Sequence, residues 1–103
     1  MRILKENQGL QTVYRLRDDD LGEVLGEAVI SESETEIRLH GIFVKAEHRG
    51  RGYGRSLMEA ILSFREAKLI TLCTGLGNVS FFKRYGFEVT EVGDSLVSME
   101  RKL

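Results

Sequence analysis

The stretch that decides the fold runs from Phe43 to Glu59 and reads Phe-Val-Lys-Ala-Glu-His-Arg-Gly-Arg-Gly-Tyr-Gly-Arg-Ser-Leu-Met-Glu. Its first residues end an apolar run typical of a strand, and its last residues begin a pattern typical of an amphipathic helix. Between them lie Gly50, Gly52 and Gly54. Glycine adopts positive φ without steric cost, so the backbone N–H groups of such a loop can turn toward one point. The stretch therefore predicts a strand, a glycine loop and a helix N-terminus that together bind a phosphate or pyrophosphate.

The loop by itself does not name the ligand. The pattern Arg49-x-x-Gly52-x-Gly54 lacks the Gly-Lys-Ser/Thr ending of a nucleotide-triphosphate loop and is shorter than the Gly-x-Gly-x-x-Gly of a dinucleotide fold. A glycine-rich turn on a basic surface is the alternative. Charge favours the anion site, because segment 45–55 carries a lysine, three arginines and one glutamate, whereas the charged residues of segment 18–36 are all acidic.

Length and composition predict one ordinary globular domain spanning residues 1–103. A net charge of -1 provides no global field that would attract nucleic acid or an anionic membrane. The single cysteine, Cys73, excludes an internal disulfide and removes the usual metal-cluster spacings. The first residues lack a secretory pattern, and no apolar run is long enough to span a bilayer. We expect a cytoplasmic protein without metal, nucleic acid or membrane partners.

Hydrophobic periodicity predicts an α/β order of elements with a mixed sheet. A short edge strand at Ile3 and Leu4 is left open. The isolated Gly26 indicates a bulge or a close backbone approach. The run at 69–74 is nearly all apolar, which is typical of a central strand covered on both faces. The predicted strands cover 12–17, 23–31, 36–45, 69–74, 87–92 and 96–99, and the predicted helices cover 54–68 and about seven residues between Asn78 as N-cap and Gly86.

Two motifs in this order resemble the GNAT superfamily of N-acetyltransferases. The first is the glycine loop with the strand before it, and the second is Asn-Val-Ser-Phe-Phe-Lys-Arg-Tyr-Gly-Phe at 78–87. The resemblance covers roughly residues 35–100. It implies a mixed, mainly antiparallel sheet with a central V-shaped splay and two packed helices, here without the usual N-terminal helix pair. It also implies direct transfer of an acetyl group from acetyl-CoA to a primary amine, carried by a small molecule or by a protein lysine or N-terminus.

The resemblance also implies which residues bind the cofactor. Phe43 and Val44 would pair with the pantetheine arm, with Ile42 near the thioester. Asn78 and Phe81 would contact the same arm, although Phe81 is also a natural core residue and Asn78 a natural helix cap. Two further groups would contact phosphates. Lys83 would contact the adenosine phosphates. The pyrophosphate would bind Arg49, Gly50, Arg51, Gly52, Tyr53, Gly54 and Arg55.

The catalytic residues are less clear from the pattern. Many relatives carry a tyrosine, which protonates the leaving thiolate, at the position of Phe82, and a phenyl ring has no proton to give. Tyr85 is a candidate substitute, or else a packing residue. His40 is the candidate base, because its even spacing from Ile42 and Val44 predicts one shared strand face. The alternative is an ordinary surface histidine. His48 is expected to pack, and Cys73 to lie in the core.

Three questions stay open. The acceptor groove is expected to be open, completed by a partner subunit in a homodimer, or suited to a bulky acceptor. The acidic segment 18–36 would favour a cationic amine if it borders that groove; otherwise it is a solvated face. Two rival functions remain. One is a non-catalytic acyl-CoA-binding module that regulates a protein partner, and the other is a nucleotide-phosphate-binding protein of unrelated chemistry.

Overall fold

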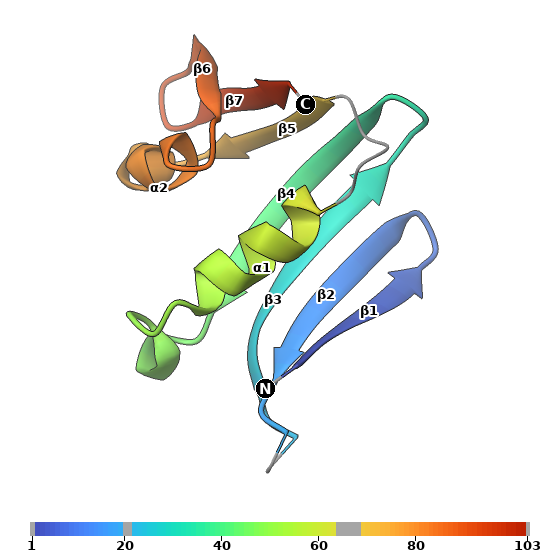
Figure 1. Ribbon diagram of the computed structural model, residues 1–103. Helices are drawn as coiled ribbons and strands as arrows, with labels where there is room; N and C mark the ends of the chain where they lie inside the picture. The colour runs from blue at the N-terminus through green and yellow to red at the C-terminus, as the bar shows by residue number, and fades with distance from the viewer. Residues whose placement is uncertain (1, 20–21, 64–68, 103) are drawn as a thin grey trace.

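The structure is a computed structural model that describes residues 2–19, 22–63 and 69–102. Its main feature is one seven-stranded sheet with two α-helices (Figure 1). The strands are β1 (Arg2–Gln8), β2 (Gln11–Arg17), β3 (Val24–Glu32), β4 (Glu36–Val44), β5 (Leu69–Thr74), β6 (Glu88–Val92) and β7 (Val97–Lys102). The helices are α1 (Tyr53–Leu62) and α2 (Val79–Lys83), preceded by the short 3-10 turns η1 (Ala46–His48) and η2 (Leu76–Asn78).

The strand order is β1-β2-β3-β4-β5-β7-β6. Strands β1 to β4 form an antiparallel meander, β4 and β5 are parallel, and β5, β7 and β6 are again antiparallel. Strand β1 resolves the open question at Ile3 and Leu4, because both residues pair with β2. The predicted mixed, mainly antiparallel sheet is confirmed.

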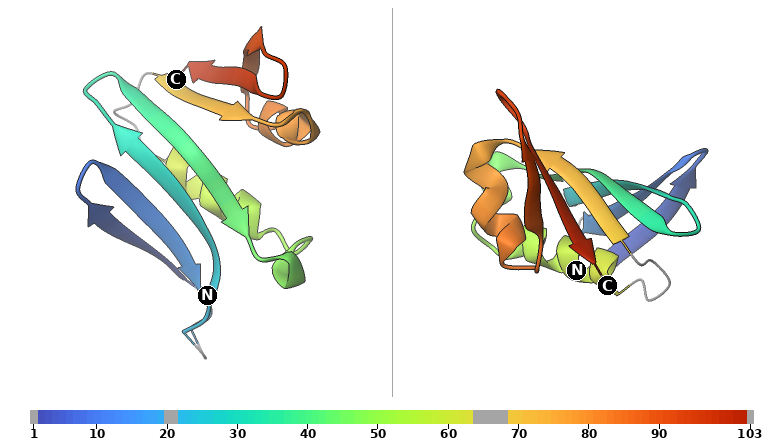
Figure 2. Two further views of the ribbon diagram at one scale, coloured as in Figure 1. Left: turned by 180° about the vertical axis from the view of Figure 1, so that it is seen from behind. Right: turned by 90° about the horizontal axis from the view of Figure 1, so that it is seen from above.

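The sheet splays at β4 and β5, the one parallel pair among the described strands. Strands β4 and β5 are in register only from Glu36/Leu69 to Leu39/Leu72. Strand β4 then continues to Val44 and β5 to Thr74 without pairing to each other, so the two halves of the sheet diverge (Figures 1 and 2). The predicted V-shaped splay is therefore present, and it leaves backbone groups of β4 free on the side that faces β5.

The core lies between the sheet and α1, whose apolar stripe Leu57, Met58 and Ile61 is fully buried. Helix α1 packs on β2, β3 and β4 and holds the first half of the sheet together. Its described part ends at Leu62, so the predicted extension to residue 68, including Phe64, lies outside the described residues. The other buried members are Tyr14, Leu16, Leu25, Ala28, Ile30, Ile37, Leu39, Ile70, Leu72, Phe82, Phe87, Val97 and Met99.

Gly26 marks a close backbone approach, as the sequence predicts. A Cβ at this position would lie 2.9 Å from the carbonyl oxygen of Phe43 and 3.3 Å from the side chains of Leu57 and Val44. The register between β2 and β3 shifts at the neighbouring pair of Leu16 and Arg17. Only a residue without a side chain lets β3, the end of β4 and α1 meet here.

Two expectations about the second half of the sheet are wrong. Strand β5 is not covered on both faces, because Ile70, Leu72 and Thr74 are buried while Cys73 is exposed. Helix α2 is shorter than predicted, because it ends at Lys83 and residues 84–86 form a turn. Asn78 occupies the N-cap position, but its side chain makes no capping hydrogen bond.

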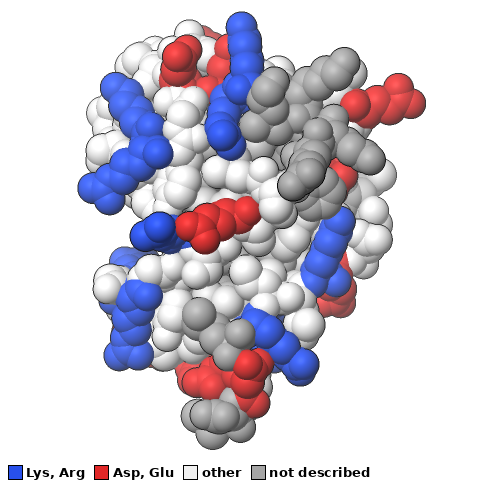
Figure 3. All heavy atoms as spheres, viewed as in Figure 1, with Lys and Arg blue, Asp and Glu red and all other residues white. Residues whose placement is uncertain are grey.

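The surface carries no large patch of one charge on the face that shows α1. Lys and Arg side chains lie between Asp and Glu side chains over the described residues of this face (Figure 3). Neither helix of the described ranges has the length and apolar character needed to cross a bilayer. The mixed charges of this face agree with the net charge of -1.

Candidate active site

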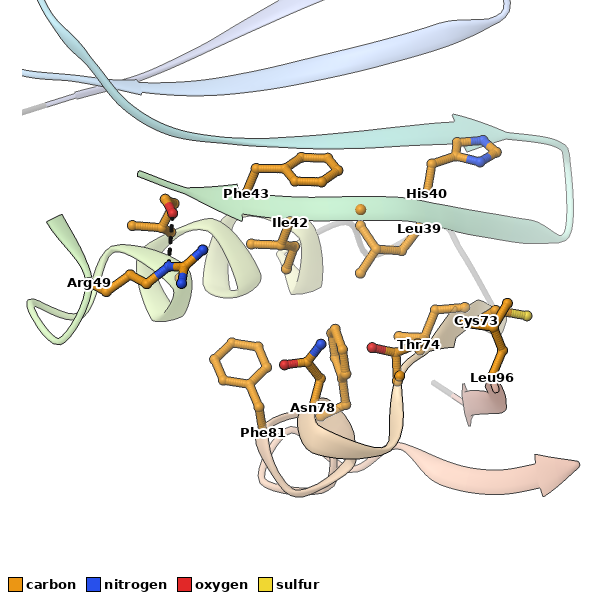
Figure 4. A pocket seen from close by; sticks show the side chains of 16 residues that line it. Leu39, His40, Ile42, Phe43, Arg49, Cys73, Thr74, Asn78, Phe81 and Leu96 are labelled. Carbon is orange, nitrogen blue, oxygen red and sulfur yellow. Dashed lines mark hydrogen bonds between the residues drawn. The ribbon is translucent and has the colours of Figure 1, made fainter. Parts of the chain in front are cut away.

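A cleft of about 660 Å³ lies between the diverging ends of β4 and β5. One wall is the end of β4 from Leu39 to Val44, with Arg49 and Gly54 at its outer end. The other wall is the end of β5 and the start of α2 (Figure 4). We call the point where the last β4–β5 pair, Leu39 and Leu72, closes the cleft its narrow end.

The glycine loop at the outer end has the backbone that its sequence predicts. Gly50 and Gly52 have φ values of 80° and 82°, which only glycine adopts without strain. Gly52 occupies the N-cap position of α1, and no side chain caps this helix. The first backbone N–H groups of α1 therefore lack a side-chain acceptor, and the positive end of the helix dipole is directed at the cleft mouth. Such an arrangement attracts an anion.

Arg49 fixes the loop to the strand before it. Its Nε atom donates a hydrogen bond to the carbonyl oxygen of Val44 at 3.2 Å (Figure 4). The guanidinium is exposed at the cleft mouth, where it would add charge to the anion site. Arg51 is also exposed, whereas Arg55 is bound to Glu59 at 3.0 Å on the outer surface of α1.

His48 anchors the other side of the loop. Its Nε2 atom lies 3.1 Å from Oε1 of Glu23, and its ring meets the ring of Tyr53 edge-on at 6.1 Å. The expectation that His48 packs is confirmed. Oxygens of Glu23 and Glu47 and a ring nitrogen of His48 lie within 4.8 Å of one another, but Lys45 already places its ammonium 3.9 Å from Glu23. This cluster is an ion-pair network.

The opposite wall is supplied by Asn78 at the end of η2 and by Phe81 of α2 (Figure 4), together with Phe82. The Asn78 amide is exposed and is not used as a cap, so it is available to a ligand. Phe81 is half-buried and reaches Gly54, where an added Cβ would lie 3.5 Å from its ring. Phe82 is 8% exposed and packs edge-on against Phe81 and Phe87. Lys83 is exposed and does not line the cleft.

A β-bulge in β4 corrects the prediction that His40 and Ile42 share a face. Val29 pairs with Gly41 but Ile30 pairs with Leu39, so His40 is the extra residue of the bulge. The alternation of side chains therefore changes at this point. Ile42 points into the cleft with Leu39, whereas His40 and Phe43 project to the other side of β4 (Figure 4). The His40 ring is exposed and bonded to Ser31, with Nε2 and Oγ 2.6 Å apart.

Tyr85 lies outside the cleft lining in the described residues. Its ring is half-buried against Phe81, at 5.3 Å between centroids. Its hydroxyl contributes to raising the pKa of Arg55, after the stronger effects of Glu59. Tyr85 therefore packs beside Phe81 and against the core, outside the cleft lining.

Cys73 is exposed, which corrects the expectation that it lies in the core. The Nη2 atom of Arg38 donates a hydrogen bond to its Sγ at 3.1 Å, and the hydroxyl of Ser98 lies 3.4 Å from the same atom. The hydrogen bonds from Ser98 and Arg38 lower the pKa of the Cys73 thiol below its ordinary value. The sequence missed this cluster because its three members come from three different strands.

Thr74 is a second residue that the sequence analysis missed. It is 9% exposed and lines the cleft beside Asn78 (Figure 4). The signal was present, because Thr74 follows Ile70 and Leu72 at strand spacing and so shares their buried face. The acidic segment 18–36, in contrast, contributes no residue to the described lining. Its members Glu27 and Glu36 instead bind Arg15 and Thr71.

The comparisons with known proteins agree with this geometry. The family model described as Acetyltransferase (GNAT) domain matches residues 9–89. An uncharacterized N-acetyltransferase of Methanocaldococcus jannaschii is 31% identical over 78 residues, which are 70% of this chain and 34% of that protein. This chain thus spans about a third of the length of that curated relative.

Solved structures show the same fold. A GNAT family acetyltransferase from Elizabethkingia anophelis with acetyl-CoA bound has a TM-score of 0.79 at 15% identity, over 91% of this chain and 77% of that one. Ard1 from Thermoplasma volcanium has a TM-score of 0.74 at 29% identity, over 91% of this chain and 70% of that one. The fold is that of the GNAT acetyltransferases. The chain belongs to the GNAT acetyltransferase family.

Proposed function

We propose that this protein transfers an acetyl group from acetyl-CoA directly to a primary amine. The observation that carries the proposal is the cleft in the β4–β5 splay, whose mouth is the uncapped N-terminus of α1 behind a glycine loop. A cofactor with a pyrophosphate and a long, thin amide-bearing arm matches both parts. The relative from Elizabethkingia anophelis, which has the same fold, holds acetyl-CoA.

The cofactor's contacts follow from this arrangement. The pyrophosphate would bind the N–H groups of Gly50 to Gly54, with Arg49 and Arg51 as cationic partners. The pantetheine arm would lie along Ile42, Phe43 and Val44 as an added strand and use the backbone groups that β5 leaves unpaired. Asn78 and Phe81 would contact the arm from α2, and Lys83 would reach the adenosine phosphates from outside the cleft.

The chemistry needs an unprotonated amine and a stabilised oxyanion. The amine nitrogen attacks the thioester carbonyl carbon, and the carbonyl oxygen becomes negative. Backbone N–H groups of β4 beyond Leu39, which β5 does not engage, supply hydrogen bonds for that charge. His40 and Tyr85 stay our predicted base and acid. His40 projects away from the cleft and Tyr85 does not line it. His40 would therefore take the proton of the amine through water, and Tyr85 would give a proton to the leaving thiolate through water.

The second candidate function is a non-catalytic acyl-CoA-binding module acting on a protein partner. The buried ring of Phe82 favours it, because this position of the cleft wall offers no proton. The two functions share the cofactor and differ in turnover. The acceptor is either a small amine or a protein amine, and the assay described next identifies which.

Calorimetric titration with acetyl-CoA, CoA, ATP and a dinucleotide, followed by thiol release with amines and basic peptides, tests the proposal. We expect binding of the CoA compounds alone and thiol release that depends on an amine. Gly52→Glu should abolish binding, because it places a carboxylate at the anion site. Gly9→Glu is the matched control, since Gly9 also has positive φ and open surroundings but lies at the β1–β2 turn. Binding without acetylated product would favour the module, and no binding would refute both.

A further inference from the structure

The narrow end of the cleft contains one polar side chain that the fold does not use. Thr74 is 9% exposed, and its hydroxyl makes no hydrogen bond with another described residue. Figure 4 shows its oxygen directed into the cleft, toward the side on which Asn78 lies. The hydroxyl is open to the cleft, so it is available to a bound ligand as a hydrogen-bond donor.

The register places Thr74 where the cleft begins. Leu72 forms the last β5 pair with Leu39 of β4, and Thr74 is the next residue on the same face of β5. Gly41 and Ile42 lie opposite, across the cleft. Thr74 is itself held in place by its pairing with Val97 of β7. The hydroxyl is therefore mounted on a strand, and a strand positions a side chain more rigidly than a loop does.

The proposed cofactor would bring its reacting end to this point. Its pyrophosphate would be held by the glycine loop at the cleft mouth, and its arm would run inward along β4. The stretch from Val44 to Leu39 is about 17 Å long at about 3.3 Å per strand residue. An extended arm that begins at the loop thus carries its thioester toward the narrow end, beside Thr74.

We propose that Thr74 is the hydrogen-bond donor to the thioester sulfur. This inference rests on the proposed acetyl transfer. The amine nitrogen forms a bond to the carbonyl carbon, the carbon–sulfur bond breaks, and its electron pair goes to sulfur. The Thr74 hydroxyl donates a hydrogen bond to the resulting thiolate and keeps its own proton. The proton that completes the CoA thiol comes through water from Tyr85, the predicted acid, and the proton of the new ammonium leaves through water to His40, the predicted base.

Other side chains of the cleft fit this task less well. Phe82 has no polar hydrogen, and Cys73 points to the opposite face of β5 from Thr74. The Asn78 amide is exposed at the start of α2, which suits a contact with the arm. Tyr85 does not line the cleft in the described residues. Thr74 is the one that combines burial, a free donor and a place at the narrow end.

The test compares wild type with Thr74→Val, Thr74→Ser and the control Thr71→Val, a matched change on the other face of the same strand. With the best acceptor amine, we expect Thr74→Val to lower kcat about 10- to 100-fold, as for one hydrogen bond to a charged group. The KM for acetyl-CoA should stay within about twofold, because the thiolate exists only late in the reaction. Thr74→Ser should retain most of kcat. Thermal melting of Thr74→Val should be close to that of wild type, because the Thr74 hydroxyl makes no hydrogen bond with another described residue and Val has a similar shape.

A second readout does not require turnover. The pKa of the CoA thiol in the complex is measured from thiolate absorbance against pH, with desulfo-CoA as the blank. We expect a higher thiol pKa in the Thr74→Val complex than in wild type, because the thiolate has lost a donor. An unchanged thiol pKa, or an unchanged kcat in an active wild type, overturns the role of Thr74 and leaves acetyl transfer standing. An inactive wild type refutes acetyl transfer, and the thiol pKa still decides whether Thr74 contacts the sulfur.

Discussion

The guanidinium of Arg38 lies 3.1 Å from the sulfur of Cys73, across the parallel pair that ends at the cleft. Ser98 approaches the same sulfur to 3.4 Å from β7. The three residues are brought together only by the sheet order, since β4, β5 and β7 are neighbours in space. Both donors stabilise the thiolate, so Cys73 is expected to be more reactive than an ordinary exposed cysteine.

Alkylation of Cys73 measures this effect. The rate with iodoacetamide should reach half its maximum at a lower pH than for a free cysteine, whose pKa is about 8.5. The sign follows from the lowered pKa, because more thiolate is present at a given pH. Ser98→Ala and Arg38→Met should each move the midpoint upward. Arg15→Met, which removes an arginine bound to Glu27, should not. A midpoint insensitive to both donors would contradict the interaction.

The positive φ of Gly52 gives a second prediction. Gly52→Ala should lower the free energy of unfolding by about 1–2 kcal/mol, because a side chain is strained at φ 82°. It should also weaken CoA binding, since the loop must change shape to relieve that strain. Gly9→Ala, at φ 66° in open space, is the control. It should be comparably destabilised yet bind CoA like wild type, and equal weakening in both would show that stability alone governs binding.

Gly26 is a place where the core and the cleft wall meet. Gly26→Ala should lower the free energy of unfolding by about 1–3 kcal/mol, because the new Cβ would lie 2.9 Å from the Phe43 carbonyl oxygen. Denaturant unfolding measures the loss. At Gly77 an added Cβ meets nothing within 4 Å, so Gly77→Ala should be near neutral. If Gly26→Ala were equally neutral, β3 and the end of β4 would be less tightly packed than the structure shows.

The contact between Glu23 and His48 supports the glycine loop from outside the cleft. Removing the carboxylate in Glu23→Ala should cost about 0.5–1.5 kcal/mol of stability, the worth of a partly buried hydrogen bond. It should also weaken CoA binding several-fold, because the turn before the loop loses its anchor. Calorimetry measures the binding. Glu47→Ala is the control, since that carboxylate is mostly exposed and lies 3.8 Å from His48. Identical effects of the two variants would argue against a specific anchor.

Tyr14 provides a test of the core at high pH. Burial, followed by the charge of Glu32, raises its pKa to about 12 from 10.0. A raised pKa means that the folded state keeps the proton longer than the unfolded state does. The stability from neutral Tyr14 is therefore complete below pH 10 and is lost as the pH rises toward 12. Relative to Tyr14→Phe, wild type should lose up to about 2 kcal/mol between these values, and parallel curves would refute the assignment.

Most of the architecture could be predicted from local patterns. The alternation at 12–17, the apolar stripe of α1 and the loop at Gly50 and Gly52 predict their elements, because side-chain period and glycine torsion act over a few residues. The loop's positive φ values and the close approach at Gly26 were both expected and are both present. These features depend on the backbone near them and little on the rest of the chain.

Tertiary structure decided which side chains are neighbours in space. The bulge at His40 depends on how β4 registers with β3, and it separates His40 from Ile42 although their spacing is even. The exposure of Cys73 and its contact with Arg38 depend on which faces of the sheet the helices cover. The free hydroxyl of Thr74 matters only because β4 and β5 part after Leu39 and Leu72. Sequence alone determined the elements and the conformation of the glycine loop. Strand register and splay join residues that are distant in the chain, and they decided which side chains line the cleft.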